Sequence, residues 1–297
     1  MNRAILMGGA LLSGLIVDAG AEEIAVKGAV IDLQFTAPPP KGLAKVAKTW
    51  IENSAKAVAT YYGSFPAKGT VLNATPTAGK VAENGEASGW FGLQIKIQLG
   101  RDATDATLRE DWVLTHEMLH LCFPTIPDKH LWLEEGLATY VEPFARARAG
   151  LITPETAWAG LMEGLPDGLP QAGDQGLDHT HTWGRTYWGG ALFCFRADLE
   201  IRKRTGNRKG LEHALRAIAD AGGTVEKQWS IDRVIALGDK GTGVPVLREL
   251  YDEMKAKPVT VDLAALWKSL GVERHGKTVR FVDDAPLAAI RKAITGL

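Results

Sequence analysis

The feature that most constrains this chain is the pentapeptide His-Glu-Met-Leu-His at residues 116–120, because two histidines spaced in this way act together only on a helix. At about 3.6 residues per turn, His116 and His120 lie one above the other on one helix face, so both imidazoles can bind one metal ion. Glu117 is rotated by about 100° from His116 and can reach a water molecule at the same site. Residues 111–122 predict this helix, because acidic residues stand at its start and Pro124 cannot continue it.

A catalytic zinc ion has three protein ligands and one open position, so the two histidines require a third donor downstream. His130 and Glu135 are the candidates. The compact motif that uses a third histidine needs glycine and histidine where this sequence has Phe123 and Ile126, which disfavours His130. Glu135 is favoured because residues 131–144 predict a second helix, whose small residues allow close packing against the first.

The pentapeptide together with Leu131–Ala138 resembles the gluzincin peptidases, in particular the membrane alanyl aminopeptidase and glycyl aminopeptidase families. The second motif of those families reads Trp-Leu-x-Glu-Gly-Phe-Ala. The segment Thr186–Leu192 is similar to their Tyr-x-Lys-Gly-Ala element, which implies that Tyr187 is the catalytic tyrosine. The resemblance covers roughly residues 85 to 220.

This resemblance implies an α+β fold, the thermolysin-like gluzincin catalytic fold, with a small mixed-sheet N-terminal lobe and a mainly helical C-terminal lobe. We therefore expect one Zn²⁺ per chain, bound by His116, His120 and Glu135. The expected function is hydrolysis of peptide bonds in a peptide or protein substrate, with Glu117 as the general base and Tyr187 as the oxyanion donor.

Two other classes of function remain open. A secreted zinc-binding or peptide-binding protein with little or no turnover would keep the ligands, but it has no need of Glu117 or Tyr187, and both are present. A scaffold that carries the motif by chance would bind no metal.

Three departures from the family pattern bear on where a peptide would be cut. The spacing from His120 to Glu135 is several residues shorter than in alanyl aminopeptidases, and Gly189 replaces the usual lysine. No Gly-x-Met-Glu-Asn segment, which holds the free amino terminus of a substrate in those enzymes, is present upstream. Only Glu83 and Glu86 could replace it, so the sequence favours internal cleavage over removal of terminal residues.

Residues 91–99 alternate between apolar and polar side chains and predict a strand directly before the zinc helix. Such a strand would line the cleft and pair with an extended substrate, which makes Gly92 and Leu93 candidate substrate-binding residues. His181 is a third candidate, as a donor to an oxyanion. The Gly- and Pro-rich residues 164–182 predict a long connection that forms either a cleft wall or a plain surface loop.

Residues 1–21 predict a signal peptide. They contain Arg3, an apolar run over residues 4–17, and the small-x-small sequence Ala19-Gly20-Ala21. The apolar run is short for a bilayer span, which disfavours an uncleaved anchor, and we expect no stable membrane span after its removal. The expected organisation is a signal peptide at 1–21, an N-terminal α/β lobe at 22–104 and a helical zinc-binding and C-terminal lobe at 105–297. The mature protein would be exported to the periplasm or the extracellular space.

The charge of the chain limits the classes of partner, and its two cysteines allow at most one disulfide. The net charge of −1 and a pI near 6.7, without a dense Lys/Arg cluster, argue against a nucleic-acid partner. Cys122 and Cys194 are the two cysteines; they could form one disulfide in an oxidising compartment or remain buried and free. Further elements are predicted by periodicity: a strand or hairpin at 24–36, a strand at 71–75, and helices at 42–62, 185–204, 208–222, 245–256, 262–270 and 285–295.

Overall fold

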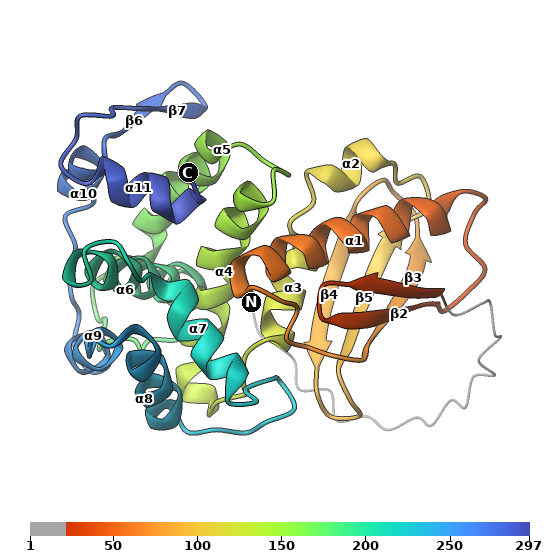
Figure 1. The fold of residues 1–297 in the computed structure, drawn as a ribbon, viewed down its shortest axis with the longest axis horizontal. Helices are drawn as coiled ribbons and strands as arrows, with labels where there is room; N and C mark the ends of the chain where they lie inside the picture. Colours follow the sequence, from red (N-terminus) through yellow and green to blue (C-terminus); the bar gives the residue numbers. More distant parts are fainter. Residues whose placement is uncertain (1–21) are drawn as a thin grey trace.

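The computed structural model describes residues 22–297 (Figure 1). The predicted signal peptide, residues 1–21, lies outside the described residues, and its cleavage stays a prediction. Within residues 22–297, no helix combines the length and the apolar character needed to cross a membrane.

The N-terminal part of the chain folds into a five-stranded mixed sheet with strand order β1-β2-β3-β5-β4. β2, β3 and β5 are parallel to one another, whereas β1 and β4 run antiparallel to their neighbours at the two edges. The long helix α1 provides the crossover from β2 to β3 that parallel pairing requires. The bounds are β1 Glu22–Val26, β2 Ala29–Phe35, α1 Leu43–Tyr62, β3 Thr70–Thr77, β4 Ala82–Ser88 and β5 Gln94–Gly100.

From residue 105 onward the chain is mainly helical, and α3 and α4 lie between the sheet and the later helices α5 to α11 (Figure 1). Buried side chains of the sheet, α1 and the helices form one continuous hydrophobic core, and the division into lobes at 104/105 stays a prediction. The elements are α2 Asp105–Arg109, α3 Val113–Leu121, α4 Leu131–Arg148, α5 Pro154–Gly164, a π-helical turn Arg185–Gly189, α6 Gly190–Arg204, α7 Leu211–Asp220, α8 Ile231–Thr242, α9 Val246–Met254, α10 Leu263–Leu270, the hairpin β6 Val272–His275 and β7 Thr278–Phe281, and α11 Ala288–Thr295.

The expectation that residues 91–99 offer a free strand edge to the cleft is wrong. β5 is paired on both sides, with β3 and β4, so its backbone hydrogen-bonding groups are already used within the sheet. The exposed edge belongs to β4, which packs against α3. The sequence pattern did not predict β4, because Glu83, Asn84 and Gly85 have low strand propensity and the strand contains a register shift there.

Both cysteines are buried and free, so the structure supports the second of the two alternatives for them. Burial raises the pKa of each thiol well above its ordinary value. Cys122 follows the zinc-binding helix α3 and Cys194 lies in α6, where both act as small apolar core residues.

A close contact between two glycines sets the position of α4 against α6. A Cβ atom added at Gly136 would lie 2.2 Å from the Cα atom of Gly190, and one added at Gly190 would lie 1.8 Å from the carbonyl oxygen of Trp132. The small residue Gly136 therefore lies against α6 and not, as the sequence suggested, against the preceding helix. This contact also brings the π-helical turn at the start of α6 close to the face of α4 that carries Glu135.

We predict that Gly136→Ala destabilises the protein by about 1–3 kcal/mol or more, because the new methyl group forces two helix backbones apart. Gly160→Ala on α5 is the matched control, since a Cβ atom at this helical glycine meets open space. The control should stabilise the protein by roughly 0.5–1 kcal/mol. Urea unfolding measures both, and equal stability of the two variants would contradict the close contact.

Candidate active site

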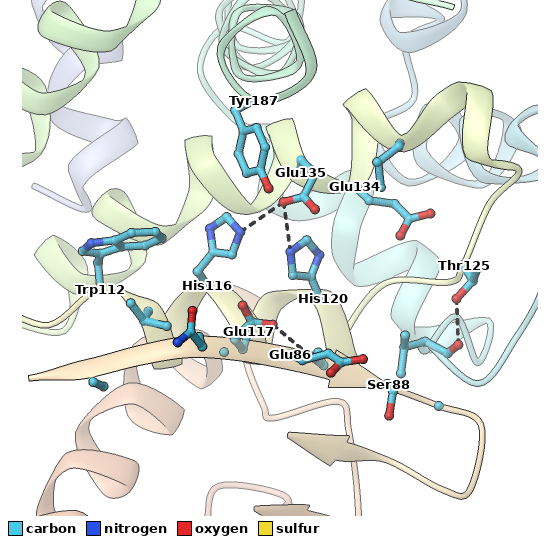
Figure 2. A pocket seen from close by; sticks show the side chains of 18 of the residues that line it. Glu86, Ser88, Trp112, His116, Glu117, His120, Thr125, Glu134, Glu135 and Tyr187 are labelled. Atoms are coloured by element: carbon cyan, nitrogen blue, oxygen red, sulfur yellow. Dashed lines mark hydrogen bonds and ion pairs between the residues drawn. The ribbon is translucent and has the colours of Figure 1, made fainter. Parts of the chain in front are cut away.

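His116 and His120 on α3 converge with Glu135 on α4, and their ligand atoms all lie within 4.8 Å of one another. The Nε2 atoms of His116 and His120 lie 3.3 Å and 3.4 Å from Oε2 of Glu135. Figure 2 shows both imidazoles directed at this carboxylate, one helical turn apart on α3. The three residues predicted as ligands are thus brought together by the fold.

The donor set and its spacing fit a zinc ion. Ligand atoms placed about 2.0–2.1 Å from zinc in a tetrahedral arrangement are about 3.4 Å apart, which matches the two measured nitrogen–oxygen distances. Two imidazole nitrogens and one carboxylate oxygen are common zinc ligands in catalytic sites that keep a fourth position open. The geometry therefore suits a metal centre with three protein ligands.

Burial and mutual contact shift the pKa values of the three groups in opposite directions. Burial alone would raise the pKa of Glu135, but hydrogen bonds from His116 and His120 outweigh it and hold the pKa well below its ordinary value. Burial lowers the pKa of His116. For His120 the contact with Glu135 outweighs burial and raises the pKa. Glu135 is thus kept in the carboxylate form that metal binding requires.

Glu117 projects from α3 onto the sheet edge. Its Oε2 atom accepts a hydrogen bond from the backbone N–H of Ala87 in β4, at 2.9 Å. Gly85 leaves room for the side chain, since a Cβ atom there would lie 2.6 Å from Cγ of Glu117. The carboxylate is thereby fixed on the opposite side of the imidazoles from Glu135 (Figure 2).

Tyr187 lies in the π-helical turn. Its ring stacks on that of His116, with ring centroids 6.5 Å apart and an angle of 20° between the ring planes. Its hydroxyl group is directed toward Glu135 (Figure 2), and the indole of Trp183 also stacks with the Tyr187 ring, with centroids 5.9 Å apart. The turn is held by Arg185, whose buried guanidinium forms an ion pair with Asp174 at 2.7 Å. Such turns often occur at functional sites, because they shift a side chain out of regular helical register.

The three ligand residues, Glu117 and Tyr187 line a cleft between β4 on one side and α3, α4 and the Tyr187 turn on the other. Backbone of residues 225–226 closes one end of it, since a Cβ atom at Gly89 would lie 2.6 Å from the backbone nitrogen of Glu226. Thr125 holds this segment in place, since its hydroxyl donates to the carbonyl oxygen of Val225 at 2.9 Å and its backbone carbonyl accepts the N–H of Trp229 at 3.0 Å. We call this the closed end.

The cleft is acidic. Among the described residues, nine carboxylate side chains line it and no lysine or arginine does, although the whole chain has nearly equal numbers of each sign. Two of them, Glu86 and Glu134, lie toward the closed end with Ser88 and Thr125 (Figure 2). Burial raises the pKa of Glu134, whose Oε1 atom accepts the N–H of Ile126 at 2.9 Å. The nine are Glu83, Glu86, Glu110, Asp111, Glu117, Asp128, Glu134, Glu135 and Glu226.

Three residues proposed from sequence for substrate binding do not line the cleft. Gly92 is exposed in the turn before β5, Leu93 is buried in the core, and His181 is exposed outside the cleft. Gly92 and Leu93 were misplaced because β4, and not β5, forms the cleft wall. Gly85 and Ala87 were not predicted from the sequence. The one signal that could have found them is the glycine at position 85, since a glycine within a strand often marks the close approach of another group.

His130 is not a metal ligand but part of a buried hydrogen-bond network. Its Nδ1 atom lies 2.8 Å from Oδ1 of Asp178, which also accepts the indole N–H of Trp132 at 2.9 Å. The hydroxyl of Tyr251 donates to the other carboxylate oxygen at 2.8 Å. Asp178 thus ties the long connection before Tyr187 to the first turn of α4 and to α9.

Comparison with known proteins supports the fold. No protein-family model matches this sequence, and no curated protein sequence matches it. An aminopeptidase N family protein from Idiomarina loihiensis has a similar structure, with a TM-score of 0.63 and 14% identity over 85% of this chain and 49% of that chain. The chain has the fold of the M1 zinc metallopeptidases. The predicted α+β gluzincin fold is therefore confirmed.

Two further solved structures show the same likeness. A mutant M1 zinc metallopeptidase from Deinococcus radiodurans, bound to a Tyr-Ser-Ala substrate, matches with a TM-score of 0.51 and 15% identity over 81% of this chain and 52% of that chain. Aminopeptidase A from Legionella pneumophila, in complex with aspartic acid, matches with a TM-score of 0.52 and 17% identity over 81% of this chain and 28% of that chain. The present chain spans about half or less of the length of these proteins.

We predict that Glu135→Ala lowers the affinity for zinc by more than about 100-fold, since loss of a residue that only supports a ligand already costs 10- to 100-fold. His181→Ala is the control and should retain one zinc ion per chain, because this histidine lies outside the cleft. Equilibrium dialysis with elemental analysis measures both. Full zinc affinity in Glu135→Ala would remove this residue from the metal centre.

Proposed function

We propose that this protein is a zinc-dependent peptidase in which His116, His120 and Glu135 hold the metal. The observation that carries the proposal is the convergence of these three groups, at 3.3 Å and 3.4 Å between nitrogen and carboxylate oxygen, directly above Glu117. The similar fold of the M1 zinc metallopeptidases supports it, and one of those proteins was solved with a tripeptide substrate. Export to the periplasm or the extracellular space is part of the proposal and rests on residues 1–21 alone.

Zinc bound at this centre would supply a Lewis acid that polarises the scissile carbonyl and makes water acidic enough to lose a proton near neutral pH. Glu117 acts as the general base, accepting the proton of the attacking water, and then returns it to the departing amine. The hydrogen bond from Ala87 orients the Glu117 carboxylate for this step. Tyr187 donates its hydroxyl proton in a hydrogen bond to the carbonyl oxygen as negative charge develops there.

The shape of the cleft favours removal of residues from a free amino terminus. The sequence favoured internal cleavage because the Gly-x-Met-Glu-Asn segment is missing and because the strand at 91–99 was expected to pair with the substrate. β5 has no free edge for that pairing. An extended chain along β4 cannot continue past Gly89, because residues 225–226 fill that space. The carboxylates of Glu86 and Glu134 near this closed end are suited to pair with an α-ammonium group.

We predict that Glu117→Gln retains one zinc ion per chain and loses on the order of 10²–10⁴-fold in kcat, the usual contribution of a positioned general base. The amide preserves the size of the side chain beside Gly85. Turnover of peptides is measured by mass spectrometry alongside the zinc content. Near-normal turnover in the zinc-loaded variant contradicts the mechanism, and an equally inactive parent protein favours the zinc- or peptide-binding alternative.

We predict that acetylation of the substrate's amino terminus lowers kcat/KM by roughly 10- to 100-fold, because it removes a charged hydrogen-bonding group worth about 1.5–3 kcal/mol. The measurement compares matched peptides with free and acetylated termini. Glu86→Gln and Glu134→Gln should each reduce the difference between the two peptides. Equal cleavage of both peptides at internal bonds would show that the closed end does not select a terminus.

A further inference from the structure

The indole of Trp112 is exposed to the cleft, although tryptophan side chains are usually buried. The side chain is 52% exposed and lines the cleft one helical turn before His116. The two rings meet edge to face, with centroids 5.4 Å apart. The backbone carbonyl of Trp112 accepts the N–H of His116 at 3.1 Å, so the backbone of Trp112 is joined to the first turn of α3. Large aromatic residues are mostly buried, and one left exposed beside a reactive centre is available for a ligand.

Trp112 lies on the opposite side of the ligand group from the closed end. Figure 2 shows it beyond His116, whereas Ser88 and Thr125 lie beyond His120. A peptide whose amino terminus lies at the closed end therefore extends toward Trp112 after the scissile bond. The first side chain on the leaving part of the substrate comes within reach of the indole.

The charges around Trp112 indicate which side chain fits. Two exposed carboxylates line the same cleft: Glu110, two residues earlier in the chain, and Glu83, at the other end of β4 from Ser88. Among the described residues, no lysine or arginine lines the cleft to compensate them. A guanidinium or ammonium group is attracted both to an indole face and to nearby carboxylates, and its alkyl stem packs on apolar surface.

We propose that Trp112 is a specificity-determining residue that favours arginine or lysine immediately after the scissile bond. This inference rests on the proposed peptidase function and on the direction of the substrate given above. The basic side chain lies over the indole of Trp112, and Glu83 and Glu110 face its charge.

The test measures binding in the zinc-loaded Glu117→Gln variant, so it does not depend on turnover. Calorimetry compares Ala-Arg-Ala with Ala-citrulline-Ala, which has the same shape without the charge. We expect the arginine peptide to bind roughly 3- to 30-fold more tightly, the range of one cation–π contact. The preference should disappear when Trp112→Ala is added, weaken at high salt, and be small for Ala-Ala-Arg. Phe91→Ala is the matched control, because Phe91 is 90% exposed and outside the cleft.

Equal binding of the arginine and citrulline peptides, absence of binding to either, or a preference that survives Trp112→Ala would overturn the inference. Tighter binding of a norleucine peptide than of the arginine peptide would also overturn it, by showing an apolar subsite. The parent protein is assayed separately for turnover. Absence of peptide hydrolysis there contradicts the proposed function, whereas the binding comparison decides the role of Trp112.

Discussion

The structure depends on one buried carboxylate. Glu135 is only 5% exposed, and a buried charge is strongly unfavourable unless it is paired and hydrogen-bonded. The imidazoles of His116 and His120 provide the pairing, so α4 must lie at a fixed distance and angle from α3. The contact of Gly136 with Gly190 then sets α6 against α4 and places the Tyr187 turn over the same point. The positions of α3, α4 and the Tyr187 turn are therefore all set relative to Glu135.

The sheet contributes the other wall through its edge strand. β4 leaves a space at Gly85 for Glu117 and supplies the N–H of Ala87 to one of its oxygens, so the backbone of the sheet edge orients the residue that we propose as the general base. Gly89, the residue after this strand, contacts residues 225–226. The sheet edge that holds Glu117 therefore also forms the closed end.

The metal-ligand set was predictable from the sequence because its residues lie in two short neighbouring motifs. The cleft was not predictable, because its walls come from distant segments of the chain. The spacing of His116 and His120 fixes one helix face, and the motif around Glu135 supplies the remaining ligand. β4 was missed because its polar, glycine-containing sequence forms a strand only through pairing with β5 and packing on α3. The closed end depends on a contact between Gly89 and residues more than a hundred positions later, for which the sequence has no local pattern.

Anomalous diffraction on either side of the zinc absorption edge, from crystals of the zinc-loaded protein, tests the central claim most directly. The account predicts one peak per chain, about 2.0–2.2 Å from Nε2 of His116, from Nε2 of His120 and from a carboxylate oxygen of Glu135. A peak bound by other residues, or no peak at this position in protein that carries zinc, would contradict it.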